Sequence, residues 1–166
     1  INHNGSVDQL LKLCKLACDS GADIIKFQHF DAEKRIGSSV RELEHIEKAL
    51  DIEENIIQML DRCKIEIKDL VKAKSYVENR GKSTMCTPFS NESFRELINN
   101  GFNQIKISSM DLNNHHLHEE IINCGKQLKL FISTGMSSLN ELKIIYEIYK
   151  NTKNSICLLL CTSSYP

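Results

Sequence analysis

Hydrophobic residues along the chain follow two alternating patterns, one with helical spacing and one in short, almost continuously apolar runs. Residues 6–20 carry apolar side chains three and four positions apart, which is the spacing of one helix face. The run DIIKFQ, residues 23–28, comes next and is typical of a short buried strand. The same two patterns recur to the end of the chain and predict helices over 53–79, 91–100, 114–124 and 138–150, and strands over 83–89, 104–108, 129–133 and 155–161.

Capping residues mark several of the predicted helix ends. Ser6 with Gln9, and Ser138 with Glu141, have the spacing of a capping box, in which each side chain bonds to the backbone of the other residue. Glycine adopts the left-handed backbone at a helix end without strain, and it stands where helices should end at positions 21, 81, 101 and 125. The helix boundaries are therefore predicted from capping chemistry as well as from periodicity.

The predicted elements alternate between helix and strand, with short connections. Strands that are apolar throughout, each followed by a helix, indicate parallel βα units with a sheet buried on both faces. Five strands are predicted in full, and the opening INHNG resembles the tail of a sixth. Either a doubly wound open sheet or part of an eight-stranded βα barrel fits this order, and the absence of a GxGxxG or Walker loop disfavours a nucleotide-binding version of the first. Residues 31–52 are charged and irregular and are predicted to be a surface loop or lid.

Composition places the chain among ordinary globular proteins. Its 166 residues suit one domain, and a hydrophobic content of 41% with 26% charged residues is typical of a soluble fold. A formal net charge of −1 predicts neither nucleic acid nor a membrane surface as a partner, and no apolar run approaches the roughly 20 residues of a membrane span. The seven cysteines show no Cys-x-x-Cys spacing and several lie in apolar segments, which predicts a reducing compartment and favours the cytoplasm.

Polar side chains follow the predicted strands at the point where each strand ends. Because parallel strands end at one rim of a barrel, where βα loops build active sites, we expect these side chains to converge. Two lysines with several hydroxyl donors at one rim predict a pocket for a small, highly charged anion such as a phosphate ester. Singly, a serine after a strand is usually a helix cap and a lysine there usually snorkels to solvent, so the prediction depends on the whole set. Its members are Lys26 and Gln28, Thr87, Lys106 and Ser109, Ser133 and Thr134, and the run Thr162, Ser163, Ser164 and Tyr165.

Histidines offer a competing interpretation of the chemistry. His115, His116 and His118 in NNHHLHEE, with the neighbouring glutamates, have a spacing that a metal ion could use. We favour the alternative that these histidines cover an exposed helix start while the apolar residues among them face the core. His3 in NHNG lies on the predicted functional rim and is a candidate site residue.

Six short segments stand out in order along the chain, namely NHNGS (2–6), GADIIKFQ (21–28), CTPF (86–89), IKISSMDLNN (105–114), STGM (133–136) and CTSSYP (161–166). Together they closely resemble the sialic acid synthase family, which includes N-acetylneuraminate, legionaminic acid and pseudaminic acid synthases. The resemblance implies a (β/α)8 TIM barrel that condenses phosphoenolpyruvate with an N-acetylated sugar aldehyde and releases phosphate. It also implies a divalent metal, Mn²⁺ or Mg²⁺, a small C-terminal antifreeze-like domain and a domain-swapped homodimer as the full-length protein.

Carried over by motif, the resemblance assigns roles to residues of the predicted rim. Lys26 and Lys106 are the expected catalytic residues, and both would hold phosphoenolpyruvate. Gln28 and Tyr165 would face the sugar. The other residues expected to bind substrate are Thr87, Ser109, Ser133 and Ser163, together with Asn2 and His3.

The chain also departs from the family pattern. Leu160 and Cys161 stand where family members have His-Cys. The last two barrel strands, the antifreeze-like domain and the metal ligands are expected beyond Pro166. Residues 1–166 are therefore expected to be an incomplete barrel domain, roughly the first six βα units, and to be inactive alone. Two alternatives stay open, a Schiff-base aldolase that uses one of the two rim lysines, and a non-catalytic relative that binds sugar acids or a protein partner.

Overall fold

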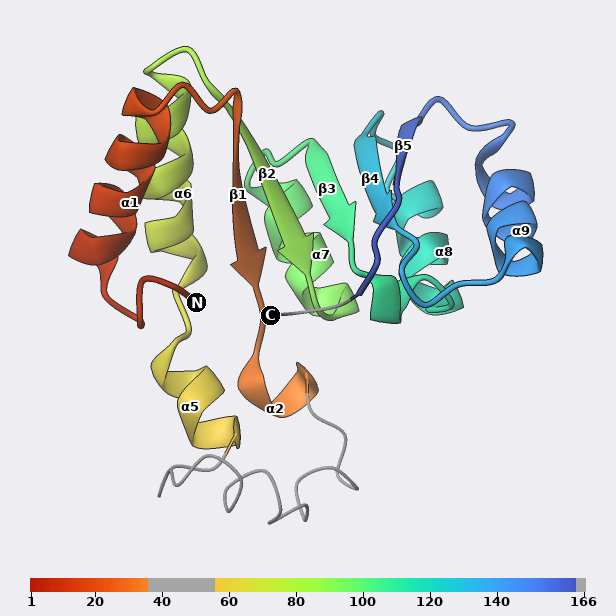
Figure 1. Cartoon of the computed structure of the whole chain (residues 1–166), viewed down its shortest axis with the longest axis horizontal. Coiled ribbons are helices and arrows are strands. Elements are labelled where there is room, and N and C mark those ends of the chain that lie inside the picture. Colours follow the sequence, from red (N-terminus) through yellow and green to blue (C-terminus); the bar gives the residue numbers. More distant parts are fainter. Residues whose placement is uncertain (36–55, 164–166) are drawn as a thin grey trace. The chain divides into compact units, whose positions relative to one another are not determined.

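Strands and helices alternate throughout residues 1–35 and 56–163, the part of the chain that the computed structural model describes (Figure 1). Five strands form one sheet in the order β1-β2-β3-β4-β5, and the pairs from β2 to β5 are parallel. The prediction of parallel βα units is therefore confirmed. Within these described segments, no helix is long and apolar enough to cross a membrane. The chain divides into two compact units, residues 1–84 and 85–166.

The first unit packs two helices together beside the first strand. α1 (Val7–Asp19) begins at Ser6, whose hydroxyl accepts a hydrogen bond from the Gln9 N–H at 3.2 Å, as predicted. In a capping box the Ser6 N–H would donate to the Gln9 side chain. Here the Ser6 N–H donates to the His3 carbonyl instead, at 2.9 Å. β1 (Ile24–His29) follows, and α6 (Ile67–Glu78) lies along α1 (Figure 1). The buried faces of the two helices contain Leu10, Cys14 and Cys18 of α1, and Leu70, Ala73 and Val77 of α6.

The prediction of one long helix over 53–79 is wrong for residues 56–79, which the structure describes. Two helices stand there, α5 (Ile56–Arg62) and α6, with an irregular segment between them. Cys63 and Ile65 lie in this break and are both buried. Core packing of these two side chains therefore interrupts a segment whose apolar spacing alone is helical.

Two irregular segments of the first unit also differ from expectation. The predicted loop or lid over 31–52 opens with a short helix, α2 (Ala32–Arg35), and the remainder of that segment lies outside the described residues. Residues 2–5 form turns where the tail of a strand was expected. Gly5 has a φ of +76°, and a Cβ atom there would lie 2.0 Å from the Arg62 carbonyl oxygen, so this turn requires glycine.

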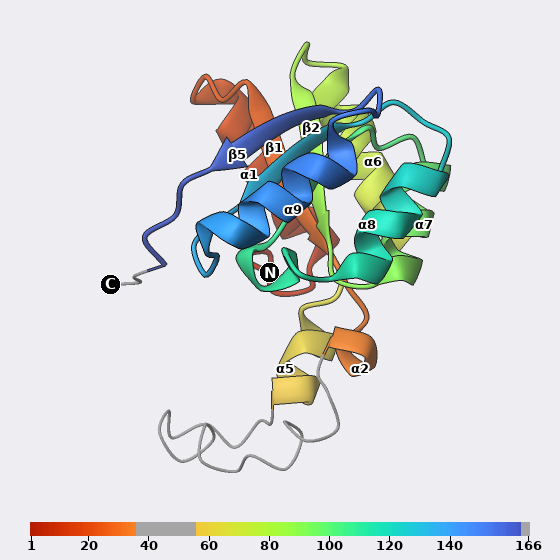
Figure 2. The same cartoon turned by 90° about the vertical axis from the view of Figure 1, so that its right-hand side faces the viewer.

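The second unit contains parallel strands with helices against one face. Figures 1 and 2 show α7 and α8 side by side on the same face of β3 and β4. Its strands are the end of β2 (Ser83–Pro88), β3 (Gln104–Ile107), β4 (Lys129–Ser133) and β5 (Ser155–Leu159). Its helices are α7 (Asn91–Asn99), the short 3-10 helix η1 (Ser109–Asp111), α8 (His115–Asn123) and α9 (Leu139–Tyr149).

Alternation of side chains gives this part of the sheet two chemically different faces. Ile105 is in register with Leu130, and both are fully buried, which places them on the face that α7 and α8 cover. Lys106 is in register with Phe131, and Phe131 with Cys157. These three side chains therefore lie on the opposite face, which we call the open face.

β5 and the residue after it leave apolar side chains exposed: Leu158 of β5 is 53% exposed, and Leu160, directly after the strand, is 95% exposed. It is the last strand of the sheet in the described part of the chain, where it pairs with β4. Exposed apolar residues along a strand edge promote association between chains. We expect residues 1–166, expressed alone, to be poorly soluble or molten by size-exclusion chromatography and near-UV circular dichroism, and Leu158→Lys to increase the soluble fraction. A monodisperse monomer with a sharp cooperative melt would contradict this expectation.

Candidate functional site

The carboxyl ends of β3, β4 and β5 bring several predicted site residues to one place. These strands are parallel, so their last residues and the loops that follow lie at one edge of the sheet. Lys106 lies near the end of β3 and Ser109 opens η1 directly after it. Ser133 is the last residue of β4, and Ser163 follows β5. We call this edge the β3–β5 rim.

Gly135 is the point at which three loops of the rim meet. Its N–H donates a hydrogen bond to Ser109 Oγ at 3.2 Å, which connects the loop after β4 to η1. A Cβ atom on Gly135 would lie 2.0 Å from Ser163 Oγ and 2.9 Å from Cys161 Cβ, so the segment after β5 also closes on this glycine. Sequence reasoning missed Gly135 as a site residue, and its place inside the STGM segment was the only available signal.

Cys161 reveals the electrostatic character of the rim. A hydrogen bond from the Ser133 hydroxyl is the main reason why the pKa of Cys161 lies below its ordinary value. The Thr134 N–H, the positive charge of Lys106 and the Ser109 hydroxyl lower this pKa further. Groups that stabilise a thiolate also stabilise other anions held in the same place. The rim is therefore suited to negative charge, and Cys161 is a second rim residue that was not predicted.

Thr87 extends the same set onto β2. Cys86 is in register with Ile105, so Thr87 lies beside Lys106 on the open face. Thr87 is 2% exposed, and its hydroxyl has no hydrogen-bond partner among the described residues. An unsatisfied buried hydroxyl costs roughly 1–3 kcal/mol, so an anion that accepts this hydrogen bond would recover part of that free energy. Ser164 and Tyr165 of the predicted rim lie outside the described part of the chain.

In the first unit, four predicted residues line one cavity. Asn2, His3, Lys26 and Gln28 contribute to a cavity of about 360 Å³ that also has apolar walls from α1. The Gly5 N–H donates to His3 Nδ1 at 3.1 Å, and burial lowers the pKa of His3. The ring is therefore neutral near pH 7 and can donate from Nε2. A cavity of this size with a few polar groups is typical of a site for a small polar ligand.

The histidines of α8 differ in their surroundings. His115 and His116 are exposed, as we favoured. His118 is 1% exposed, and the exposed position expected for it is wrong. Its Nε2 lies 2.8 Å from the Leu112 carbonyl oxygen and its Nδ1 lies 2.7 Å from the Tyr149 hydroxyl. A ring on the core face is tolerated because both of its nitrogens find polar partners.

No metal centre forms from the residues that the structure describes. Within residues 1–35 and 56–163, no group of three or more His, Cys, Asp or Glu side chains could hold a metal ion. The divalent metal that the family resemblance implies has its expected ligands beyond Pro166, and none of the described residues is assigned to it. The lysine and hydroxyl groups of the β3–β5 rim suit an anion.

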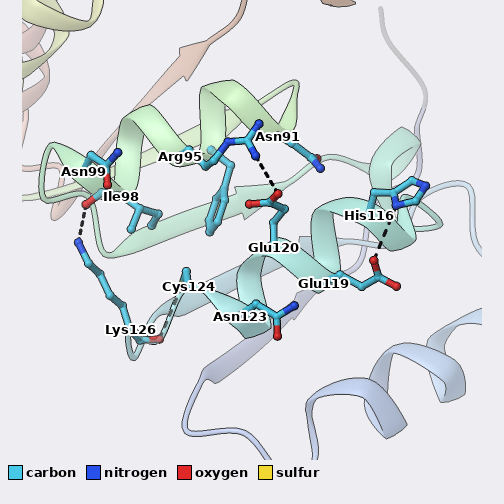
Figure 3. A pocket seen from close by; sticks show the side chains of 11 residues that line it. Asn91, Arg95, Ile98, Asn99, His116, Glu119, Glu120, Asn123, Cys124 and Lys126 are labelled. Atoms are coloured by element: carbon cyan, nitrogen blue, oxygen red, sulfur yellow. Dashed lines mark hydrogen bonds and ion pairs between the residues drawn. The ribbon is translucent and has the colours of Figure 1, made fainter.

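A second hollow, of about 450 Å³, lies between α7 and α8 (Figure 3). Arg95 of α7 forms an ion pair with Glu120 of α8 across it, at 3.0 Å. Lys126 Nζ donates to the Ile98 carbonyl at 2.7 Å. Arg95, Glu120 and Lys126 are thus engaged by the protein itself, and none of the residues predicted for the rim lines this hollow. We do not consider it a functional site.

A parallel βα sheet whose strands lie in sequential order, with a lysine and hydroxyl groups at their carboxyl ends, is typical of the βα proteins whose ligand sites occupy that rim. The NeuB family model matches residues 13–166, and the chain belongs to this family. It is 31% identical over 169 residues to the N,N'-diacetyllegionaminic acid synthase of Campylobacter jejuni, covering 100% of this chain and 50% of that protein. It is 27% identical to the human N-acetylneuraminate-9-phosphate synthase, over 99% of this chain and 45% of that protein. The chain spans about half the length of these curated relatives.

Solved structures show the same fold. The sialic acid synthetase of Leptospira borgpetersenii, in complex with citrate, matches with a TM-score of 0.84 and 27% identity, over 99% of this chain and 52% of that chain. A spore coat polysaccharide biosynthesis protein E of Chromobacterium violaceum matches with a TM-score of 0.81 at 20% identity, over 99% of this chain and 48% of that chain. The predicted α/β fold, part of a sialic acid synthase barrel, is confirmed.

Proposed function

We propose that this chain is part of a synthase that condenses phosphoenolpyruvate with an N-acetylated sugar aldehyde, such as N-acetylmannosamine or a related bacterial sugar, to give a nonulosonic acid and phosphate. The observation that carries the proposal is the meeting of Ser109, Ser163 and Cys161 at Gly135, at the β3–β5 rim of a chain of the NeuB family. Relatives named legionaminic acid, pseudaminic acid and N-acetylneuraminate-9-phosphate synthases support it. The Leptospira synthetase binds citrate, which resembles phosphoenolpyruvate in being a small polyanion.

Phosphoenolpyruvate carries a phosphate and a carboxylate, so its site needs positive charge and several hydrogen-bond donors. In the second unit, Lys106 would supply the charge. Lys26 of the first unit is proposed as the other cation. The donors proposed to surround the ligand are the hydroxyls of Thr87, Ser109, Ser133 and Ser163.

The side chains of this chain are proposed to position the reactants and to form no covalent bond with them. C3 of phosphoenolpyruvate attacks the aldehyde carbon, and the aldehyde oxygen takes a proton to become a hydroxyl. Water then adds at C2 and loses one proton. The C–O bond to phosphate breaks as the new C2 hydroxyl gives its remaining proton to the departing phosphate, which leaves a 2-keto acid. Donors fixed around the phosphate and carboxylate stabilise the charges that move in these steps, because they do not have to reorganise as water would.

The cavity of the first unit is proposed to face the sugar. Asn2, His3 and Gln28 line it. Tyr165 is also proposed to bind the sugar. Residues 1–166 would form one incomplete barrel domain, with the ligands of a Mn²⁺ or Mg²⁺ ion beyond Pro166. The full-length protein is proposed to be a cytoplasmic homodimer that acts on small molecules.

Phosphate release from phosphoenolpyruvate by the full-length protein tests the proposal. We expect release to require both phosphoenolpyruvate and an N-acetylated sugar aldehyde, with N-acetylmannosamine as the first sugar to try. Reactions without sugar provide the background. A pyruvate adduct trapped on a lysine by borohydride would indicate the Schiff-base aldolase instead, and no release with any sugar would indicate a non-catalytic relative.

A further inference from the structure

The segment that carries Ser109 is held from several sides, and one of these contacts is buried. This segment, residues 108–114, contains η1 and leads from β3 to α8. Within it, the Ser108 hydroxyl donates to Asp111 Oδ2 at 2.5 Å and the Asn114 N–H donates to the Asp111 carbonyl at 3.0 Å. Two short internal bonds shape the segment but do not fix where it lies relative to the strands. Its placement has to come from outside contacts.

His118 supplies the buried outside contact. Leu112, at the end of η1, is 1% exposed, and its carbonyl oxygen lies 2.8 Å from His118 Nε2. A carbonyl can only accept a hydrogen bond, so Nε2 carries the hydrogen. Burial lowers the pKa of His118, which favours the neutral ring, and Nδ1 is then an acceptor. The Tyr149 hydroxyl, 2.7 Å away, donates to it.

Tyr149 connects this contact to α9. It is the last residue of α9 and is 2% exposed, with its ring edge-on to His118 at 5.6 Å between centroids. The other end of α9 holds the same segment, because Asn113 Nδ2 donates to Glu141 Oε1 at 2.5 Å. Gly135, in the loop that leads into α9, donates to Ser109 Oγ. Both ends of α9 and the loop before it therefore hold residues 108–114.

We propose that His118 and Tyr149 are positioning residues, which hold residues 108–114 so that Ser109 meets Gly135 before the anionic substrate arrives. The inference rests on the proposed function, in which Ser109 binds phosphoenolpyruvate. Neither side chain touches the substrate. Their buried hydrogen bonds fix the segment in advance, so that binding does not have to order it.

Four variants of the full-length protein test the proposal. His118→Leu removes both hydrogen bonds, and Tyr149→Phe removes only the hydroxyl. His118→Gln keeps an amide N–H that can reach the Leu112 carbonyl. His116→Leu is the matched control, because His116 lies on the same helix with its side chain 87% exposed.

We expect His118→Leu to raise the dissociation constant and KM for phosphoenolpyruvate by roughly 2- to 30-fold, with a much smaller change in kcat. Tyr149→Phe should show a smaller increase, His118→Gln should restore most of the affinity, and His116→Leu should bind as the wild type does. Amide hydrogen exchange should accelerate at Asp111 and Asn114 in His118→Leu but not within β3 or β4. Equal acceleration at all amides, or unchanged exchange in the segment, would overturn the proposal. If the wild type fails to bind phosphoenolpyruvate, the proposed function fails, and the exchange measurement alone still decides the positioning role.

Discussion

Lys106→Met is expected to weaken phosphoenolpyruvate binding by roughly 2 to 5 kcal/mol, the range for removing one partner of a desolvated charge pair. Methionine keeps the apolar stem of the lysine, so packing on the open face beside Phe131 is preserved and the charge is the main loss. The hydroxyls of the β3–β5 rim would remain, but hydroxyl donors add no charge to balance a phosphate and a carboxylate. Isothermal titration calorimetry with phosphoenolpyruvate measures the difference directly.

Lys129→Met is the matched control for this experiment. Lys129 lies at the opposite end of its strand, as the first residue of β4, and it is exposed. Its ammonium lies 5.2 Å from the Phe131 ring centroid. Lys129→Met therefore removes a lysine charge from the same sheet, but at the end opposite the rim. We expect the Lys129→Met variant to bind phosphoenolpyruvate with the affinity of the wild type. Equal affinities in Lys106→Met and the wild type would remove Lys106 from the site.

Sequence periodicity was a good guide to the elements of this fold, and it failed where packing replaced local preference. The five strands and most helix ends fall close to their predicted places, because apolar runs and capping residues act locally. Cys63 and Ile65 misled the prediction, since two apolar residues continue a helical pattern even when they face the core from an irregular segment. Glu66, at the start of α6, makes no side-chain capping bond that could have marked the break.

The residues of the candidate site also fall into two groups, those that the sequence could predict and those that it could not. Residues such as Lys106 and Ser109 could be predicted because parallel strands place their carboxyl ends together, which makes position along the chain a guide to position in space. Gly135 and Cys161 could not, because their roles depend on contacts between the loops after two neighbouring strands. The burial of His118 could not be predicted, because the apolar residues Leu117 and Ile121 already supply a core face for this helix. Its burial depends on the Tyr149 hydroxyl, thirty-one positions later in the chain.

Gly135→Ala is expected to disturb the rim more than the fold. The new methyl group would lie 2.0 Å from Ser163 Oγ and 2.9 Å from Cys161 Cβ. The Ser163 hydroxyl can rotate away, but Cys161 Cβ and its carbonyl, 3.1 Å from the new atom, can move only with the backbone. We expect a loss of roughly 1–3 kcal/mol, the usual cost of added volume in a packed region. Most of it should appear as weaker phosphoenolpyruvate binding by calorimetry, because the rim can relieve the clash by moving its donors apart.

A second substitution separates the clash from other effects of the methyl group. Ser163 has a φ of 54°, a backbone conformation that glycine adopts freely, so Ser163→Gly removes the nearest clashing atom without adding strain. In the double variant we expect the midpoint of thermal unfolding to return toward that of the wild type, while phosphoenolpyruvate affinity stays low because a proposed donor is gone.

Gly125→Ala provides the opposite contrast. Gly125 has a φ of +69°, and a Cβ atom there would meet nothing within 4 Å, so alanine should lower stability by roughly 1–2 kcal/mol through backbone strain and leave binding unchanged. Wild-type affinity in Gly135→Ala would show that the three loops do not meet at this glycine when the ligand is bound.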